Sequence, residues 1–159
     1  MLTSTIPYTS SMISVQPTSY TDVSPYLWSL VLSFSAVILT IPPLYVARFK
    51  AQFEIADLSS LRAMFDRYPA WGKRASWAHQ NSLESFTLHA PAVLLALLAV
   101  ISGHSLPSLS ALVAIAHPIL RLIYVFAYIV NVSFLRSFCW VMGLLCSGII
   151  YGTALSAMT

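Results

Sequence analysis

The sequence Trp77-Ala78-His79-Gln80-Asn81-Ser82-Leu83-Glu84-Ser85-Phe86 places a few polar side chains directly before a long apolar run. That run continues over residues 87–101 without a Lys, Arg, Asp or Glu residue. Asn81 and Glu84 are three residues apart, so a helix places them on one face. An unpaired amide or carboxylate in hydrocarbon costs several kcal/mol. The stretch therefore predicts a membrane helix whose polar face has partners on another helix, a neighbouring subunit or a ligand.

The composition of the whole chain indicates an integral membrane protein. Of its 159 residues, 58% are hydrophobic and 8% are charged, whereas a soluble domain carries roughly 25% charged residues. The mean hydropathy is +0.78. The apolar runs reach the length of about 20 residues that a helix needs to cross a bilayer, and none alternates as membrane β-strands do. We therefore expect an all-α fold, an integral membrane four-helix bundle.

Four membrane spans are expected, at about residues 26–46, 75–102, 109–130 and 137–157. They form one domain over residues 25–159, with Pro25 at the start of the first helix. Residues 1–24 are rich in Ser, Thr and Pro and are interpreted as a polar N-terminal arm. The first span holds four small hydroxyl residues, Ser29, Ser33, Ser35 and Thr40. These hydroxyls either line a close helix contact or bond back to their own backbone, and we favour the second interpretation.

The distribution of charge predicts how the chain lies in the membrane. Residues 48–74 hold six of the eight Lys and Arg residues, together with three acids. This mixture is typical of a segment near lipid headgroups rather than of a nucleic-acid site. We expect the segment to be partly helical, to lie at the membrane interface and, with the turn at Arg136, to face the cytoplasm. Membrane lipids are the expected partners, and we expect no binding to nucleic acid.

A second polar stripe lies in the third span. His117, Arg121, Tyr124 and Tyr128 have the spacing i, i+4, i+7 and i+11, which places them on one helix face. A guanidinium group inside an apolar run is costly unless it is paired. Glu84 is the only acidic residue inside any expected span, so we predict a contact between Glu84 and Arg121. Such a contact either fixes the register of two helices or belongs to a binding site.

The same residue types suit a site for a small zwitterion or anion. Arg121 and Arg136 would hold carboxylates or a thiolate, and Glu84 would take an ammonium group. Asn81 and the tyrosines of the third span would donate hydrogen bonds. Arg136 lies near the start of the fourth span, where the positive end of the helix dipole adds to its charge. A thiol held there would be favoured in its ionised form.

The remaining histidines and the cysteines are interpreted as structural or solvated. His79 is expected to point toward the membrane interface, His89 to bond a backbone carbonyl, and His104 to lie in a turn. Cys139 and Cys146 are seven residues apart in the last span, which makes a disulfide within one helix implausible. We expect both to be buried free thiols. The sequence shows no metal-ligand spacing, so no metal site is predicted.

Two longer motifs resemble those of a known family. The stretch Arg74-Ala75-Ser76-Trp77-Ala78-His79-Gln80-Asn81-Ser82-Leu83-Glu84 resembles the second-helix signature of the MAPEG family (membrane-associated proteins in eicosanoid and glutathione metabolism). The later Arg121-Leu122-Ile123-Tyr124-Val125-Phe126-Ala127-Tyr128, followed by Leu135-Arg136, is similar to the third-helix and fourth-helix motifs of that family. The resemblance covers about residues 47–159, and its Ala-His-Gln-Asn pattern is that of bacterial-type members.

The resemblance implies a four-helix protomer assembled as a homotrimer, with glutathione bound as co-substrate between neighbouring subunits. The glutathione-binding residues that it implies are Asn81, Glu84, Arg121, Tyr124 and Tyr128. It gives Arg136 the catalytic role of activating the thiolate. Trp77 stands where members active on glutathione carry an arginine, and Arg74, almost one turn earlier, is the residue that could replace that arginine at the site.

Two functions follow from these residues. The first is a glutathione-dependent transferase or peroxidase that acts on lipophilic electrophiles entering from the bilayer, with Arg136 stabilising the attacking thiolate. The second is a non-catalytic membrane protein that binds lipid in the cleft between subunits, or serves as a structural or interaction subunit. Whether the chain is an enzyme depends on whether Trp77 fills the place of a carboxylate.

Overall fold

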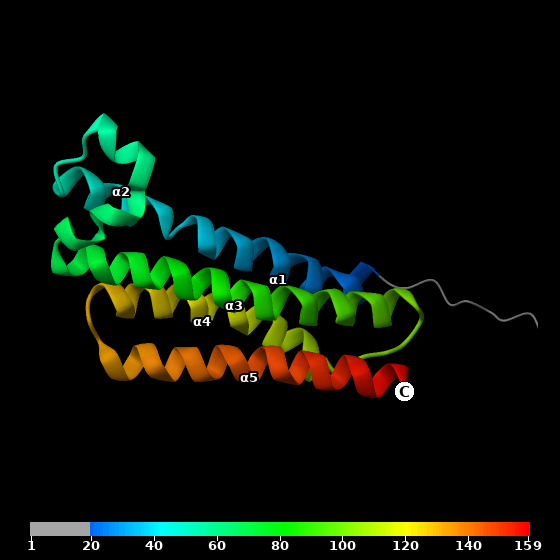
Figure 1. Cartoon of the computed structure of the whole chain (residues 1–159). Helices are drawn as coiled ribbons and strands as arrows, with labels where there is room; N and C mark the ends of the chain where they lie inside the picture. The colour runs from blue at the N-terminus through cyan, green and yellow to red at the C-terminus, as the bar shows by residue number, and fades with distance from the viewer. Residues whose placement is uncertain (1–19) are drawn as a thin grey trace, which may run out of the picture.

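The computed structural model describes residues 20–159, which form five α-helices and one 3₁₀ segment (Figure 1). They are α1 (Tyr20–Ile38), α2 (Ile41–Lys50), the 3₁₀ segment η1 (Ile55–Arg67), α3 (Ala70–Ile101), α4 (Ser108–Ile129) and α5 (Ser133–Met158). Four segments are long and apolar enough to cross a membrane: α1 with α2, then α3, α4 and α5. The expected all-α fold with four spans is therefore confirmed.

The four spans run alternately in opposite directions along one bundle (Figure 1). α3 packs against α1, α4 and α5, and α4 also packs against α1 and α5. α1 begins at the end of the bundle where α5 finishes (Figure 1). The opposite end carries α2, η1 and the starts of α3 and α5, and with them seven of the eight Lys and Arg residues of the chain. We call it the basic end; its cytoplasmic location stays a prediction.

The first helix differs from the expected one at both of its ends. The sequence predicted Pro25 at the start of the first helix. This was wrong, because α1 begins at Tyr20 and Pro25 lies inside it. A proline this close to the start disturbs only the opening turns of the helix. Residues 1–19, most of the expected arm, lie outside the described residues. α1 ends at Ile38, and the helix resumes at Ile41 with Pro42 and Pro43 in its first turn, where their missing N–H groups cost nothing.

Small side chains let the spans approach closely. On α3 the fully buried residues include Ala75, Ala78, Ala92, Ala96 and Ala99. Alanine at such positions allows helix backbones to come together, which is the main source of packing energy between helices in lipid. Val93 and Ile150 fill the remaining space in the main core.

A second, smaller core lies at the basic end, where α2 and η1 fold together over the start of α3 (Figure 1). Its buried members are Leu44, Ala47, Ala51, Met64 and Tyr68. We call residues 41–68 the cap; the expected helical character of this region is confirmed. A Cβ atom on Gly72 of α3 would lie 2.6 Å from the Cβ of Ala47. Glycine at this position therefore lets the cap contact α3 directly.

Candidate functional site

The polar stripe of α4 lies on one face and continues onto α5. The central guanidinium carbon of Arg121 lies 4.0 Å from the centroid of the Tyr124 ring. Tyr124 and Tyr128 meet edge to face with centroids 5.4 Å apart, and the guanidinium carbon of Arg136 lies 4.6 Å from the Tyr128 centroid. We call this series of contacts the Arg–Tyr ladder. It connects the bundle interior to the basic end, and each cation over a ring contributes about 0.5–2 kcal/mol.

Arg121 is buried, with 3% of its surface exposed, and it is held mainly by α3. One terminal nitrogen donates to the backbone carbonyl of Asn81 at 3.0 Å and lies 3.4 Å from the hydroxyl of Ser82. The Nε atom of Arg121 has no hydrogen-bond partner, and the Arg121 side chain lines a narrow recess between α1, α3 and α4. The guanidinium group is therefore only partly satisfied within the protomer.

The predicted contact between Glu84 and Arg121 is not formed, and this prediction was wrong for the single chain. Glu84 is exposed, and its Oε1 atom accepts a hydrogen bond from the side-chain amide of Gln80 at 3.3 Å. Among the residues that the structure describes, the only ion pair lies in the cap. Arg121 reaches α3 on the inner side that carries Ser82, whereas Glu84 lies on the outer side of the helix.

Asn81 and Arg74 also form contacts within the protomer. The side-chain amide of Asn81 donates to the carbonyl of Trp77, one turn earlier, at 2.9 Å. The Nε atom of Arg74 donates to the carbonyl of Ile129 at 3.0 Å. Ile129 is the last residue of α4, where a cation suits both the free carbonyls and the negative end of the helix dipole. Arg74 thus fastens α3 to the end of α4.

Trp77 covers the outer face of α3 at the basic end. Its ring centroid lies 5.6 Å from that of Phe65 in η1, and the ammonium group of Lys73 lies 5.4 Å from the same Phe65 centroid. Trp77 nevertheless remains 46% exposed. The position that would carry an arginine in glutathione-active members therefore presents an aromatic surface.

A buried cluster of histidines and serines lies deeper in the bundle, and the sequence did not predict it. The rings of His89 and His117 are stacked, with centroids 3.5 Å apart and planes inclined by 6°. Every ring nitrogen lies 2.8–3.2 Å from a serine hydroxyl. The serines are Ser29 and Ser33 of α1, Ser85 of α3 and Ser147 of α5. This Ser–His cluster therefore connects all four spans.

Two expectations were wrong at this cluster. His89 bonds serine hydroxyls and not a backbone carbonyl, and Ser29 and Ser33 contact other helices and not their own backbone. Ser35 and Thr40, in contrast, do donate to backbone carbonyls of their own segment, those of Val31 and Val37. A signal was present in the spacing, because Ser29 and Ser33 lie four residues apart on α1 and Ser85 and His89 lie four apart on α3. Two such stripes predict facing polar surfaces.

The remaining histidines and the cysteines lie outside the ladder and the Ser–His cluster. His79 lies 2.6 Å from the Thr40 hydroxyl, which joins α3 to the segment between α1 and α2. His104 is exposed in the turn after α3. Cys139 and Cys146 are buried free thiols. Within residues 20–159, no cluster of His, Cys, Asp and Glu residues is suited to a metal ion.

The fold and the site together define a multi-pass integral membrane protein with polar side chains inside an α-helical bundle. The model of the MAPEG family matches residues 26–156, so the chain belongs to the MAPEG family. The match begins in α1, well before the motifs at which the resemblance is visible by eye. No curated protein and no solved structure matches the chain. Membership makes this a membrane protein of a family associated with glutathione and eicosanoid metabolism.

Proposed function

We propose that the protein is a glutathione-dependent transferase or peroxidase that acts on lipophilic electrophiles, assembled as a homotrimer with its sites between subunits. The observation that carries the proposal is the placement of Arg136. Its guanidinium group lies over the Tyr128 ring at the basic end, is half-buried, and has no carboxylate partner among the described residues. Its charge is therefore available to an anion.

Arg136 would stabilise the thiolate form of glutathione. It lies in the first turn of α5, where unpaired backbone N–H groups and the helix dipole add to the positive potential. The thiolate would attack an electrophilic carbon, forming a C–S bond while the displaced electron pair leaves with the leaving group. On a hydroperoxide it would attack the outer oxygen, releasing an alcohol after protonation, and a second glutathione would convert the resulting sulfenic acid into a disulfide and water.

The other residues proposed for the glutathione site are Asn81, Glu84, Arg121, Tyr124, Tyr128 and Arg74. Glu84 is the side chain best placed for the ammonium group, because it is exposed and bonds only the Gln80 amide. Arg121 and Tyr124 are buried, so they would orient the half-buried Tyr128 from the interior of the bundle. Tyr128 in turn limits the directions that Arg136 can take.

Trp77 favours a second function. An indole ring packed on Phe65 cannot neutralise a carboxylate, but it offers an apolar surface that suits an acyl chain. The alternative is a non-catalytic member of the family that binds lipid in the cleft between subunits, or serves as a structural subunit.

Titration of the detergent-solubilised protein with glutathione separates the two functions. The catalytic proposal predicts saturable thiolate absorbance and a heat of binding in the wild type. Arg136→Ala should abolish the thiolate signal, and Arg136→Lys should retain part of it because the charge remains without the planar group over Tyr128. Glu84→Gln should weaken binding without removing the thiolate of bound glutathione. Absence of both signals in a protein that native mass spectrometry shows to be a trimer would exclude the enzyme and leave lipid binding.

A further inference from the structure

The outside of the cap carries unusually exposed apolar side chains. Ile55 is 81% exposed, Phe49 is 72% exposed, and Leu58, one 3₁₀ turn after Ile55, is 60% exposed. In the part of the chain whose burial is described, only Phe134, at the start of α5 and also at the basic end, is a more exposed large apolar residue than Ile55 and Phe49. Exposed apolar groups of this kind mark a surface that meets another apolar phase or a partner.

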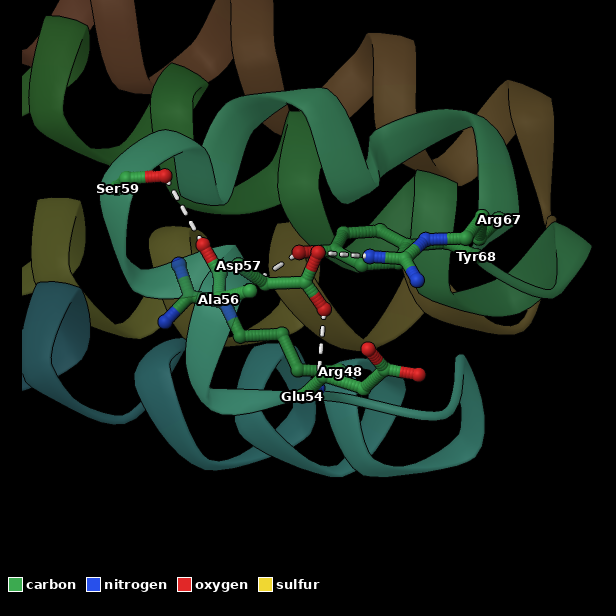
Figure 2. Close-up of polar contacts among 7 residues, drawn as sticks. All are labelled: Arg48, Glu54, Ala56, Asp57, Ser59, Arg67 and Tyr68. Carbon is green, nitrogen blue, oxygen red and sulfur yellow. Dashed lines mark hydrogen bonds and ion pairs between the residues drawn. The ribbon is translucent and has the colours of Figure 1, made fainter.

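These side chains belong to a folded unit. Figure 2 shows polar contacts among residues of the cap, most of them within or next to η1. Asp57 accepts a hydrogen bond from the backbone N–H of Glu54 at 3.0 Å and forms an ion pair with Arg67, ten residues later. Arg48 of α2 donates from Nε to the hydroxyl of Tyr68 at 3.3 Å. With the small core beneath them, these contacts hold the exposed apolar side chains in a defined orientation.

The cap that carries these apolar side chains also carries exposed positive charge. Lys50 and Arg62 are exposed, and neither has a carboxylate partner among the described residues. One of the three acids of residues 48–74, Asp57, is already neutralised by Arg67. The six cations of this segment therefore outweigh its acids. The surface combines apolar insertion with attraction for anions.

We propose that the cap is a membrane-surface anchor that binds anionic phospholipid headgroups. Phe49, Ile55 and Leu58 enter the boundary between headgroups and acyl chains, and Lys50 and Arg62 pair with lipid phosphates. The position of the cap supports lipid over a protein partner, because α2 is the end of a membrane span that reaches Lys50. The surface therefore starts at headgroup level, where aromatic and aliphatic side chains beside cations are the usual pattern.

The proposal predicts selectivity between lipids. A Lys or Arg near an anionic surface strengthens membrane binding by about fivefold. Apolar insertion alone would not distinguish phosphatidylglycerol from phosphatidylcholine. Charge and insertion can therefore be separated by changing the lipid and the two cations independently.

Nitroxide labels measure the depth of single positions in full-length protein reconstituted into vesicles. Labels at Ile55→Cys and Leu58→Cys report on the cap, and Ser105→Cys, exposed in the turn at the opposite end, is the control. The wild type gives the background from its two buried cysteines. In vesicles containing phosphatidylglycerol, accessibility to oxygen relative to a water-soluble nickel chelate should be higher at both cap positions than in phosphatidylcholine vesicles. It should not change at residue 105, and Lys50→Gln with Arg62→Gln should remove the difference between lipids.

Two results would overturn the proposal. Cap labels as accessible to the nickel chelate as the control in both vesicle types would show that the cap faces water. Equal depth in phosphatidylcholine and phosphatidylglycerol would show that no anionic headgroup is recognised. A label-free measurement guards against disturbance by the labels. In a variant with Trp28→Phe and Trp140→Phe, the remaining Trp71 and Trp77 pack against the cap, and brominated phosphatidylglycerol should quench their fluorescence more than brominated phosphatidylcholine. That excess should vanish when the two cap cations are also replaced by glutamine.

Discussion

The imidazole rings of His89 and His117 lie stacked in parallel, 3.5 Å apart between centroids, at the point where all four spans meet. The hydrogen bonds of the cluster assign the proton on one ring. Ser29 donates its proton to the carbonyl of Ala114 at 2.6 Å, so it must accept from Nε2 of His89 at 2.8 Å. The Nδ1 atom of His89 lies 3.1 Å from the hydroxyl of Ser147, which also lies 3.2 Å from the carbonyl of Gly143. His89 therefore carries a proton on Nε2.

Removing one ring should destabilise the bundle. His117→Leu introduces an apolar side chain of similar size and leaves the hydroxyls of Ser33 and Ser85 without their imidazole partner. We expect the free energy of unfolding, measured by detergent-mixture titration, to fall by about 1–3 kcal/mol. His104→Leu, in an exposed turn, should change it by less than about 0.5 kcal/mol.

A double variant tests whether the two rings act together. Because His89 and His117 are in contact, the cost of His89→Leu with His117→Leu should be smaller than the sum of the two single costs. Costs that add fully would contradict a shared cluster and would indicate two independent packing positions.

The membrane spans were predictable because long apolar runs in this chain are separated by charges, prolines or polar turns. Residues 102–107 and 130–132 are short and leave little freedom for the helix ends. The start of α1 was not predictable in the same way. Tyr20 precedes three polar residues and Pro25, which locally resemble an arm, whereas the helix begins at Tyr20 and α1 packs against α3 and α4.

The site was predictable only where its contacts lie along one helix. The spacing of Arg121, Tyr124 and Tyr128 determines their common face, so the part of the ladder that lies on α4 follows from the sequence. Contacts between helices depend on which faces meet. The stripes Ser29–Ser33 and Ser85–His89 indicate two polar faces, but the spacing alone does not give the partner of each hydroxyl, and the Ser–His cluster was missed for this reason. The Glu84–Arg121 pair failed because complementary charge does not specify the direction of a side chain.

Arg121 gives a test of whether a buried charge is kept for stability. Methionine has a similar length and no charge, and replacing a buried charged group by an apolar one is often neutral or stabilising. We expect the free energy of unfolding of Arg121→Met to be higher than that of the wild type, or lower by no more than about 1 kcal/mol. Thiolate formation should fall, because Tyr124 loses the cation over its ring.

Arg121→Ala is the matched control, since it leaves a cavity and should cost about 2–5 kcal/mol. If Arg121→Met were as unstable as Arg121→Ala, the guanidinium group would be a structural element of the bundle and not a part of the site.

Trp77→Arg should increase the affinity for glutathione. The variant adds a guanidinium group at the outer face of α3, and a hydrogen bond to a charged group contributes about 1.5–3 kcal/mol, which corresponds to at least about tenfold in affinity. Calorimetric titration measures the change. Trp77→Gln removes the ring without adding charge; an equal gain in that variant would show that release of space, and not charge, is responsible.

The cap should loosen in acid through Asp57. The backbone N–H of Glu54 and the guanidinium group of Arg67 hold the pKa of Asp57 below its ordinary value, which is about 3.9. A carboxyl group with a lower pKa in the folded state adds stability above its unfolded pKa and loses that contribution as the pH falls toward the folded value. Amide hydrogen exchange of η1, corrected for intrinsic rates, should therefore accelerate below about pH 4 while that of α5 does not. Asp57→Asn keeps an acceptor for the Glu54 N–H but cannot ionise, so its cap should show no such acceleration; a wild-type profile identical to that of Asp57→Asn would contradict the role of the carboxylate.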